Sequence, residues 1–164
     1  MPDFRNRNDK VHMSSPETDI QLPPADTFDA EDETAVLAAA RDALFRWAET
    51  ISSGEVEDVL GLYAADAILV PTLSNEIGGK EEERRRYFEF FLSNGIPRCT
   101  IDREKSRVSR KLGTVVIGGL YSFYFERNGR DEIVPARFLF TFEKIDGRWL
   151  ITGHHSSRLT EPAA

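Results

Sequence analysis

Apolar residues recur at helical spacing in the first part of the sequence that carries a regular pattern. They form one apolar helix face at Leu37, Ala40, Leu44, Trp47 and Ile51. Asp29 is the expected N-cap, because its side chain can accept a hydrogen bond from the first turn and the acidic residues after it suit the positive end of a helix. Gly54 is expected to end this long amphipathic helix.

Three shorter patterns lead from this helix to the middle of the chain. Val56–Tyr63 has the spacing of a short second helix, and the apolar run Asp66–Thr72 predicts a buried strand. Lys80–Asn94 predicts a third helix after a pair of glycines. Its basic run Arg84–Arg86 is expected to form a solvated face, paired with the acidic residues that precede it.

Beyond Pro97 the pattern changes to runs of β-branched and aromatic residues. Four strands are predicted, at residues 99–110, 114–126, 134–145 and 148–157. Asn128-Gly129 and Asp146-Gly147 favour tight hairpin turns, and Gly118-Gly119 indicates a bulge or the close approach of another segment. Helices followed by a strand meander predict an α+β domain, in which a curved antiparallel sheet wraps around the long first helix.

Composition sets the extent of this domain. The chain has 164 residues, 40% of them hydrophobic, which is enough for one domain with a substantial core. Most of the 11 phenylalanines stand in the second half, which predicts a core or cavity walled by aromatic rings. Residues 1–28 contain four prolines and no apolar period, so we expect a disordered leader, then one domain at 29–160 and a tail at 161–164.

Charge and cysteine content narrow the function classes. The formal net charge of −7 argues against general nucleic-acid binding and against electrostatic attachment to a membrane, both of which require a basic face. No apolar stretch is long enough to span a bilayer. The single Cys99 cannot form an intrachain disulfide or a multi-thiolate metal site. We therefore expect a cytoplasmic protein without a metal or a cofactor.

Two adjacent histidines close the last predicted strand. Because neighbouring strand side chains point to opposite faces, either His154 or His155 must face the interior. A bulge at Gly153 would reverse the alternation, so the sequence leaves open which of the two it is. Histidine can act as acid, base or hydrogen-bond donor near neutral pH, so the inward residue is a candidate for ligand binding.

Arg137 is the second candidate for ligand binding. It shares its predicted strand face with Leu139, so we expect the guanidinium to be enclosed and partnered rather than solvated. The partner is either the carboxylate of a ligand or a protein carboxylate such as Asp66 or Glu143. Together with an inward histidine, an enclosed Arg137 would form a polar pocket for a small anion.

Hydroxyl groups could complete this pocket. Thr72 and Ser74 are expected at its mouth, and Tyr63 and Tyr121 could point their phenols into it. Each of these residues is more often a packed core residue with a satisfied hydroxyl. If the protein is an enzyme, one of the two histidines would act as the base, and Tyr63 or Tyr121 would donate to an oxyanion.

Five short motifs stand in a specific order along residues 30–160. They are Tyr63–Ser74 (YAADAILVPTLS), Tyr87–Leu92, Gly119–Phe123, Val134–Phe138 and His154–Ser157. Their order and spacing resemble the nuclear-transport-factor-2-like (NTF2-like) superfamily, which includes the SnoaL-like proteins and ketosteroid isomerase. More narrowly, they resemble the branch of the calcium/calmodulin-dependent kinase II association domain and of small bacterial proteins of the SgcJ/EcaC type.

This resemblance implies a cone-shaped fold, homodimers formed through the sheet or a larger ring, and a pocket that contains Arg137. The superfamily includes isomerases, cyclases, dehydratases and assembly modules, so the fold alone does not select the function. Three hypotheses follow. The first is a ligand-binding or assembly domain for a small organic anion. The second is a SnoaL-like isomerase, cyclase or hydratase acting on a hydrophobic metabolite, and the third is a pure oligomerisation module.

Overall fold

The computed structural model describes residues 32–160. These residues form three helices and five strands, with the first strand between the second and third helices and the other four strands after them. The helices are α1 (Glu33–Ile51), α2 (Val56–Leu60) and α3 (Glu81–Ser93), and the strands are β1 (Tyr63–Val70), β2 (Arg98–Ser109), β3 (Thr114–Arg127), β4 (Arg130–Ile145) and β5 (Arg148–Arg158). The predicted leader at residues 1–28 and the predicted tail at 161–164 lie outside the described residues. The α+β class is confirmed.

α1 begins later than the sequence predicts. Its N-cap is Asp32, whose carboxylate accepts a hydrogen bond from the Thr34 N–H at 3.1 Å, so the expected cap at Asp29 is wrong. Several acidic residues here could cap a helix, and only the one where extended backbone turns helical does so. The helix buries one face, as predicted, at Val36, Ala40, Ala43, Leu44, Trp47, Ala48 and Ile51.

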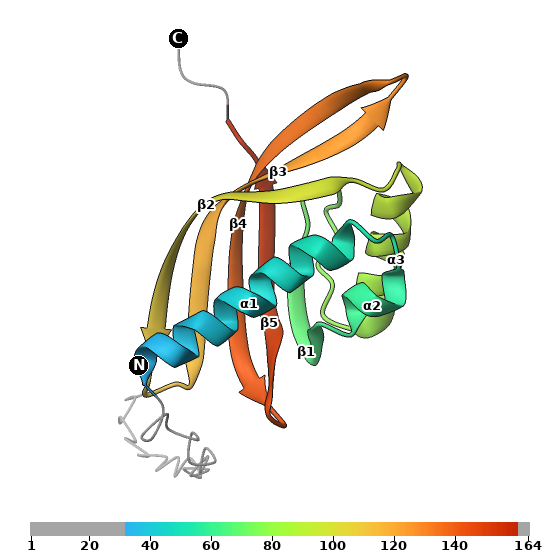
Figure 1. Ribbon diagram of the computed structural model, residues 1–164. Coiled ribbons are helices and arrows are strands. Elements are labelled where there is room, and N and C mark those ends of the chain that lie inside the picture. The colour runs from blue at the N-terminus through green and yellow to red at the C-terminus, as the bar shows by residue number, and fades with distance from the viewer. Residues whose placement is uncertain (1–31, 161–164) are drawn as a thin grey trace, which may run out of the picture.

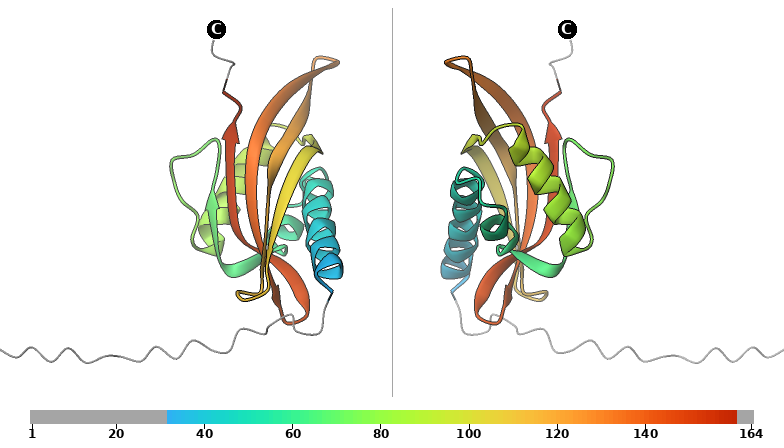
Figure 2. Two further views of the ribbon diagram at one scale, coloured as in Figure 1. Left: turned by 90° about the vertical axis from the view of Figure 1, so that its left-hand side faces the viewer. Right: turned by 90° about the vertical axis from the view of Figure 1, so that its right-hand side faces the viewer.

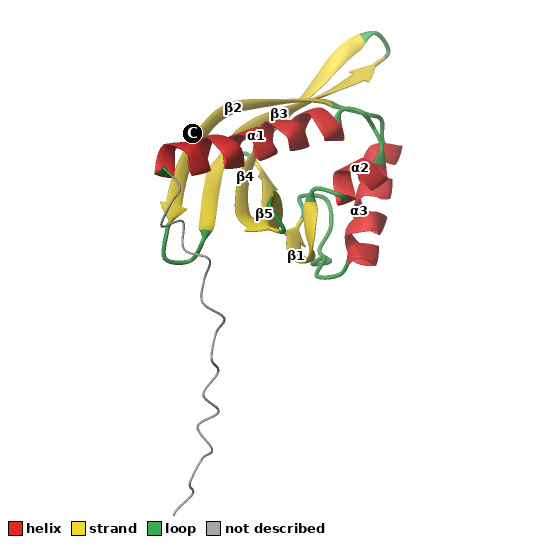
Figure 3. Cartoon of the chain, turned by 60° about the horizontal axis from the view of Figure 1, so that its bottom comes forward, coloured by secondary structure: helices red, strands yellow, loops and turns green. Residues whose placement is uncertain are grey.

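The five strands form one curved sheet in the order β1-β5-β4-β3-β2. β2 to β5 pair antiparallel as a meander, whereas β1 pairs parallel with β5. The sheet is therefore mixed rather than purely antiparallel, because the chain crosses through α3 from β1 to the opposite edge before the meander begins. α1 lies across the inner face of the sheet, with α2 and α3 towards the β1 side (Figure 1). The sheet curves around α1, as predicted (Figures 2 and 3).

Two-residue turns set the register of the meander. Asn128 and Gly129 join β3 to β4, and Asp146 and Gly147 join β4 to β5. All four residues have positive φ, between 50° and 75°, as the primed hairpin turns require. The hairpins predicted at these dipeptides are confirmed, and they place Phe138, Phe140 and Phe142 of β4 on the inner face.

Gly119 marks a close approach between two strands. A Cβ at this position would lie 2.0 Å from the Arg103 carbonyl oxygen, where the pairing of β2 with β3 is irregular. No side chain fits at that separation, so the prediction of a bulge or close approach at Gly118-Gly119 is confirmed.

β1 starts three residues before the predicted strand and is irregular near its start. Tyr63, expected at the end of the second helix, is the first residue of β1. The parallel pairing with β5 moves from Tyr63 directly to Ile68, so residues 64–67 leave the regular ladder. The carbonyl groups of such a bulge need other hydrogen-bond donors.

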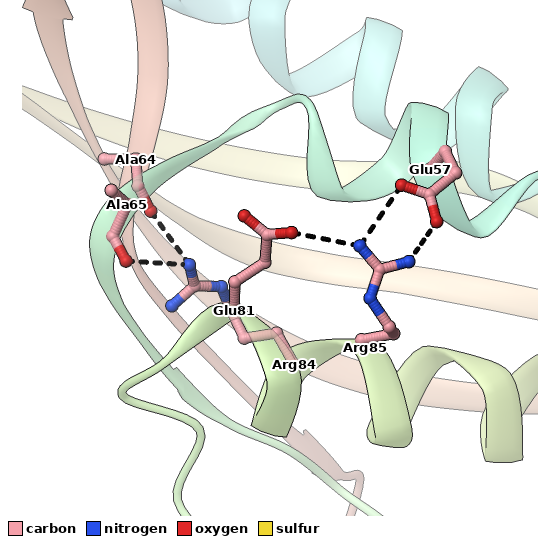
Figure 4. A network of polar contacts seen from close by, with 6 residues as sticks. All are labelled: Glu57, Ala64, Ala65, Glu81, Arg84 and Arg85. Carbon is pink, nitrogen blue, oxygen red and sulfur yellow. Dashed lines mark hydrogen bonds and ion pairs between the residues drawn. The ribbon is translucent and has the colours of Figure 1, made fainter.

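Arg84 supplies those donors. Its guanidinium donates to the carbonyl oxygens of Ala64 at 3.1 Å and Ala65 at 3.0 Å (Figure 4). It also donates to the carbonyl oxygen of Ala67 at 2.6 Å. The side chain is 1% exposed, so the prediction of a solvated Arg84 is wrong. The reason is that the first turn of α3 packs against the bulge of β1, which the sequence pattern does not reveal.

The neighbour of Arg84 behaves as the charge pattern indicates. Arg85 pairs with Glu81 at 3.0 Å, one helical turn away, and with Glu57 of α2 (Figure 4). The prediction of a solvated basic face paired with the preceding acidic residues is thus confirmed for Arg85 and wrong for Arg84.

Candidate functional site

A cavity of about 210 Å³ lies between the inner face of the sheet and the helices α1 and α3. The rings of Phe88, Phe91, Phe123 and Phe125 line much of it, in agreement with the predicted aromatic cavity. Pockets for drug-sized ligands start at about 300 Å³, whereas a cavity of about 150 Å³ holds one benzene molecule. The space therefore suits a ligand of about one ring.

A bulge in β5 decides which histidine reaches this cavity. The pairing with β4 skips Thr152, so Thr152 is an extra residue in the strand. Strict alternation from the buried Ile151 would turn His155 inward, and the extra residue turns His154 inward instead. His154 is 5% exposed and lines the cavity, while His155 is exposed on the outer face.

Two buried neighbours fix the state of His154. The Trp47 indole N–H donates to the Tyr63 hydroxyl at 3.0 Å, and this hydroxyl lies 2.8 Å from His154 Nδ1. Because Trp47 can only donate, the Tyr63 hydrogen is free to point to Nδ1, which places the hydrogen of a neutral imidazole on Nε2. Burial, and secondarily the charge of His155, lowers the pKa of His154 from 6.5 to about 3, so the ring is neutral at neutral pH.

The second ring nitrogen of His154 is a hydrogen-bond donor without an acceptor in the described part of the chain. Its Nε2 is buried and has no hydrogen-bond partner among residues 32–160. The ring itself is held firmly, since it stacks on Phe140 with centroids 4.0 Å apart and meets the edge of Trp47. A buried donor without a partner costs free energy, which a ligand with an acceptor atom would recover.

A second polar cluster lines the cavity next to His154. Tyr121 donates to the Ser156 hydroxyl at 2.5 Å, and this hydroxyl lies 2.5 Å from that of Thr72. Burial raises the pKa of Tyr121 well above its usual value, so the phenol keeps its proton. The structure thus brings the predicted site residues Thr72 and Tyr121 together through Ser156, which the sequence indicated only as part of a polar strand end.

Arg137 does not reach the cavity. It lies exposed on the outer face of β4, where its Nε donates to the Ser157 hydroxyl at 3.2 Å. The prediction of an enclosed arginine is wrong. The phenylalanines of β4 occupy the inner face, so Arg137 and the residues that alternate with them lie on the outer face. Leu139, whose presence on that face indicated burial, is itself 48% exposed.

Three further sequence candidates also lie elsewhere. Ser74 does not line this cavity, and its hydroxyl accepts a hydrogen bond from the Glu76 N–H in the loop after β1. Asp66 is exposed, and the Glu143 carboxylate accepts a hydrogen bond from Thr152. Within the described part of the chain, neither carboxylate pairs with Arg137.

Two other arginines stand at the mouth of the cavity, where β3 and β5 end. Arg127 is engaged, since it donates to the Asn94 carbonyl and its Nε lies 3.7 Å from Glu132. The Arg158 guanidinium has no hydrogen-bond or ion-pair partner among the described residues. Sequence reasoning missed Arg158 because it stands at a strand end, where alternation does not indicate direction.

Between residues 32 and 160, no group of three His, Cys, Asp or Glu residues is placed to hold a metal ion. Cys99 is half-buried, and burial raises the pKa of its thiol to about 12. None of the helices between residues 32 and 160 has the length and apolarity needed to cross a bilayer.

Residues 40–160 match the family model of the calcium/calmodulin-dependent protein kinase II association domain. The chain belongs to this family. A solved structure from Xanthomonas campestris, described as such an association domain, is 35% identical to it. That likeness covers 86% of this chain and 99% of the other, with a TM-score of 0.68.

More distant structures share the fold of this association-domain family member. An NTF2-like protein of unknown function from Pseudomonas putida is 11% identical over 80% of this chain and 92% of its own, with a TM-score of 0.67. A protein from Streptomyces avermitilis, described as a dehydratase of the NTF2-like family, is 12% identical over 79% of this chain and 100% of its own, with a TM-score of 0.69. The comparison with curated proteins gave no match.

Proposed function

We propose that this chain is a self-associating domain whose cavity binds a small organic anion of about one ring in size. The observation that carries the proposal is that His154, whose Nε2 has no hydrogen-bond partner among residues 32–160, lines a cavity together with Arg158, whose guanidinium is unpaired in the same range. Because the imidazole is neutral, the inner end of the cavity favours an uncharged acceptor, such as a hydroxyl or carbonyl oxygen. The carboxylate of the ligand then faces Arg158, where a guanidinium can bind it.

The same contacts favour binding over catalysis. A general base needs a free lone pair, and the lone pair of His154 Nδ1 is engaged by Tyr63. The depressed pKa of His154 also makes the ring a poor proton acceptor at neutral pH. A cavity of about 210 Å³ is small for the hydrophobic metabolite that the enzyme hypothesis requires.

Ligand binding can be tested with a panel of small acids and their neutral counterparts. Benzoate, 4-hydroxybenzoate, short hydroxy acids and benzamide would be titrated by calorimetry and by thermal unfolding. We expect at least one carboxylate to bind, and Arg158→Gln to weaken that binding about tenfold or more, because a charge-assisted hydrogen bond contributes about 1.5–3 kcal/mol. The matched control Arg137→Gln removes the same charge from the outer face and should leave the affinity unchanged.

Two results would overturn the ligand proposal. One is that no carboxylate of the panel raises the melting temperature at millimolar concentration. The other is that Arg158→Gln and Arg137→Gln change the affinity equally, which would mean that the anion responds to net charge rather than to the cavity mouth.

Self-association is proposed to use the outer face of the sheet. Ile68 on β1 and Leu139 on β4 are 52% and 48% exposed on the outer face, on the side of the sheet away from β2. Exposed apolar side chains gathered on one sheet face are typical of protein–protein contacts. The family description as an association domain supports the same role.

Light scattering at several protein concentrations tests the proposed self-association. We expect a dimer, and a closed ring would favour the pure assembly hypothesis. Leu139→Glu should give monomers, whereas Leu112→Glu, in the turn between β2 and β3, should not. A wild-type monomer at micromolar concentration would contradict self-association.

A further inference from the structure

The outer surface of β2 carries an unusual concentration of positive charge. Arg103, Lys105 and Arg107 alternate along the strand and are all exposed, and Arg110 and Lys111 follow in the turn. We call these five residues the basic β2 surface. Between them, Glu104 points the other way and pairs with Arg41 of α1 at 2.5 Å.

The basic β2 surface is not neutralised by acidic side chains in the described range. None of its five cations has an ion-pair partner between residues 32 and 160. Alternating strand residues lie about 7 Å apart, so the three cations on β2 repel one another. The whole chain has a net charge of −7, so general basicity does not explain this surface.

One segment of the chain has the complementary charge. Residues 11–31 contain five acidic residues, Glu17, Asp19, Asp26, Asp29 and Glu31, and no lysine or arginine. They also contain Ile20, Leu22 and Phe28, which could cover apolar outer-face neighbours of the cations. On that face, Arg103 pairs with Leu120 and Arg107 pairs with Val116 across the β2–β3 ladder.

The attachment point of this segment lies close to the basic β2 surface. The segment joins α1 at Asp32, and α1 packs along β2 through the Arg41–Glu104 pair. The start of α1 and the turn between β2 and β3 are at the same end of the molecule (Figures 1 and 3). Twenty-one extended residues span up to about 70 Å, so the reach of the segment does not limit its access to the outer face.

We propose that residues 11–31 bind along the basic β2 surface of their own chain. The acidic side chains neutralise the row of cations on this edge strand of the sheet. This interaction is independent of the cavity and of its ligand.

Paramagnetic relaxation in the full chain tests the proposal. A spin label is attached at Ser15→Cys in a Cys99→Ala background, and broadening of the Lys105 and Arg107 amides is measured. We expect broadening at 50 mM salt that largely disappears at 1 M salt, because the screening length falls from about 14 Å to about 3 Å. Neutralising the segment should abolish it, in a variant that combines Glu17→Gln, Asp19→Asn, Asp26→Asn, Asp29→Asn and Glu31→Gln.

A matched control separates specific docking from net charge. The control variant neutralises five exposed acidic residues elsewhere, through Glu49→Gln, Asp58→Asn, Glu82→Gln, Glu89→Gln and Glu126→Gln, and should keep the broadening. Equal broadening in the wild type and the segment-neutralised variant would overturn the proposal. The proposal would also be overturned by broadening in a mixture of spin-labelled chains without isotope enrichment and isotope-enriched chains without a spin label. Such broadening would mean that the segment binds another copy of the chain.

Discussion

The two faces of the sheet treat the same residue types in opposite ways. On the inner face, His154 and Tyr63 are buried, uncharged and hydrogen-bonded to each other. On the outer face, His155 is exposed, and the Tyr124 ring lies beneath the Arg98 guanidinium at 3.9 Å. Strand geometry, rather than residue type, therefore decides whether a polar side chain lies in the site or on the surface.

Arg84 and Arg137, whose exposure the sequence pattern predicted incorrectly, show the same contrast. Arg84, on a helix and within a charged run, is buried because β1 presents unpaired carbonyls to it. Arg137, on a strand among apolar residues, is exposed because the phenylalanines of β4 occupy the inner face. A buried arginine follows from unsatisfied acceptors near it, which an apolar neighbourhood in sequence does not indicate.

The largest expected effect separates these two arginines. Arg84→Met should lower the free energy of unfolding by about 4 kcal/mol, because three carbonyl acceptors of the β1 bulge would lose their donor. Arg137→Met should change it by less than about 0.5 kcal/mol. Urea unfolding at one protein concentration measures both, and similar losses in the two variants would show that the buried Arg84 contributes no more than the exposed Arg137.

A smaller effect is expected for the two tyrosines. Tyr63→Phe removes the hydroxyl that joins Trp47 to His154 and leaves both partners buried without a hydrogen bond. We expect a loss of about 2–3 kcal/mol in unfolding free energy. Tyr124→Phe, on the outer face, should cost less than about 0.5 kcal/mol. If Tyr63→Phe were as stable as Tyr124→Phe, the inner cluster would not contribute to the fold.

The smallest effect concerns the two histidines and pH. The folded pKa of His154 is about 3, whereas the unfolded value is near 6.5, so below pH 6.5 only the unfolded chain takes up the proton. Stability from this group is complete above pH 6.5 and falls towards pH 3, with a loss of about 2 kcal/mol between pH 7 and pH 5.

The matching variants isolate that contribution. His154→Gln should lose less stability than the wild type between pH 7 and pH 5, because it lacks the titrating ring. His155→Gln should retain the loss seen in the wild type. Urea unfolding at the two pH values provides the measurement, and a His154→Gln variant with the wild-type pH dependence would show that the ring can be protonated in the folded state.

Much of the fold could be predicted from local patterns. The 3.6-residue period gave α1 its buried face, and the asparagine–glycine and aspartate–glycine turns gave the hairpins their register. The position of β1 could not be predicted in the same way. Its parallel pairing with β5 depends on contacts between segments about 85 residues apart, such as Leu69 with His154.

The candidate site was predictable in its composition and not in its arrangement. Tyr63, Tyr121, Thr72 and one histidine were all expected near a pocket, and the structure places them on the cavity or on its polar clusters. The connection of Thr72 with Tyr121 through Ser156 required β3, β5 and the segment after β1 to meet. Arg158 at the mouth had no sequence signal, because a charged residue at a strand end is usually solvated.

Neighbours along the chain fix which elements form, and they require one of two adjacent histidines to face inward, so the sequence was sufficient for both. Contacts between distant segments were needed to establish that the inward residue is His154, that Arg84 is buried and that Arg137 is not. The first outcome depends on one extra residue in β5 and the second on backbone acceptors of β1 that the sheet leaves unpaired. The third depends on which face of β4 packs against the helices, and the side-chain pattern alone records none of the three.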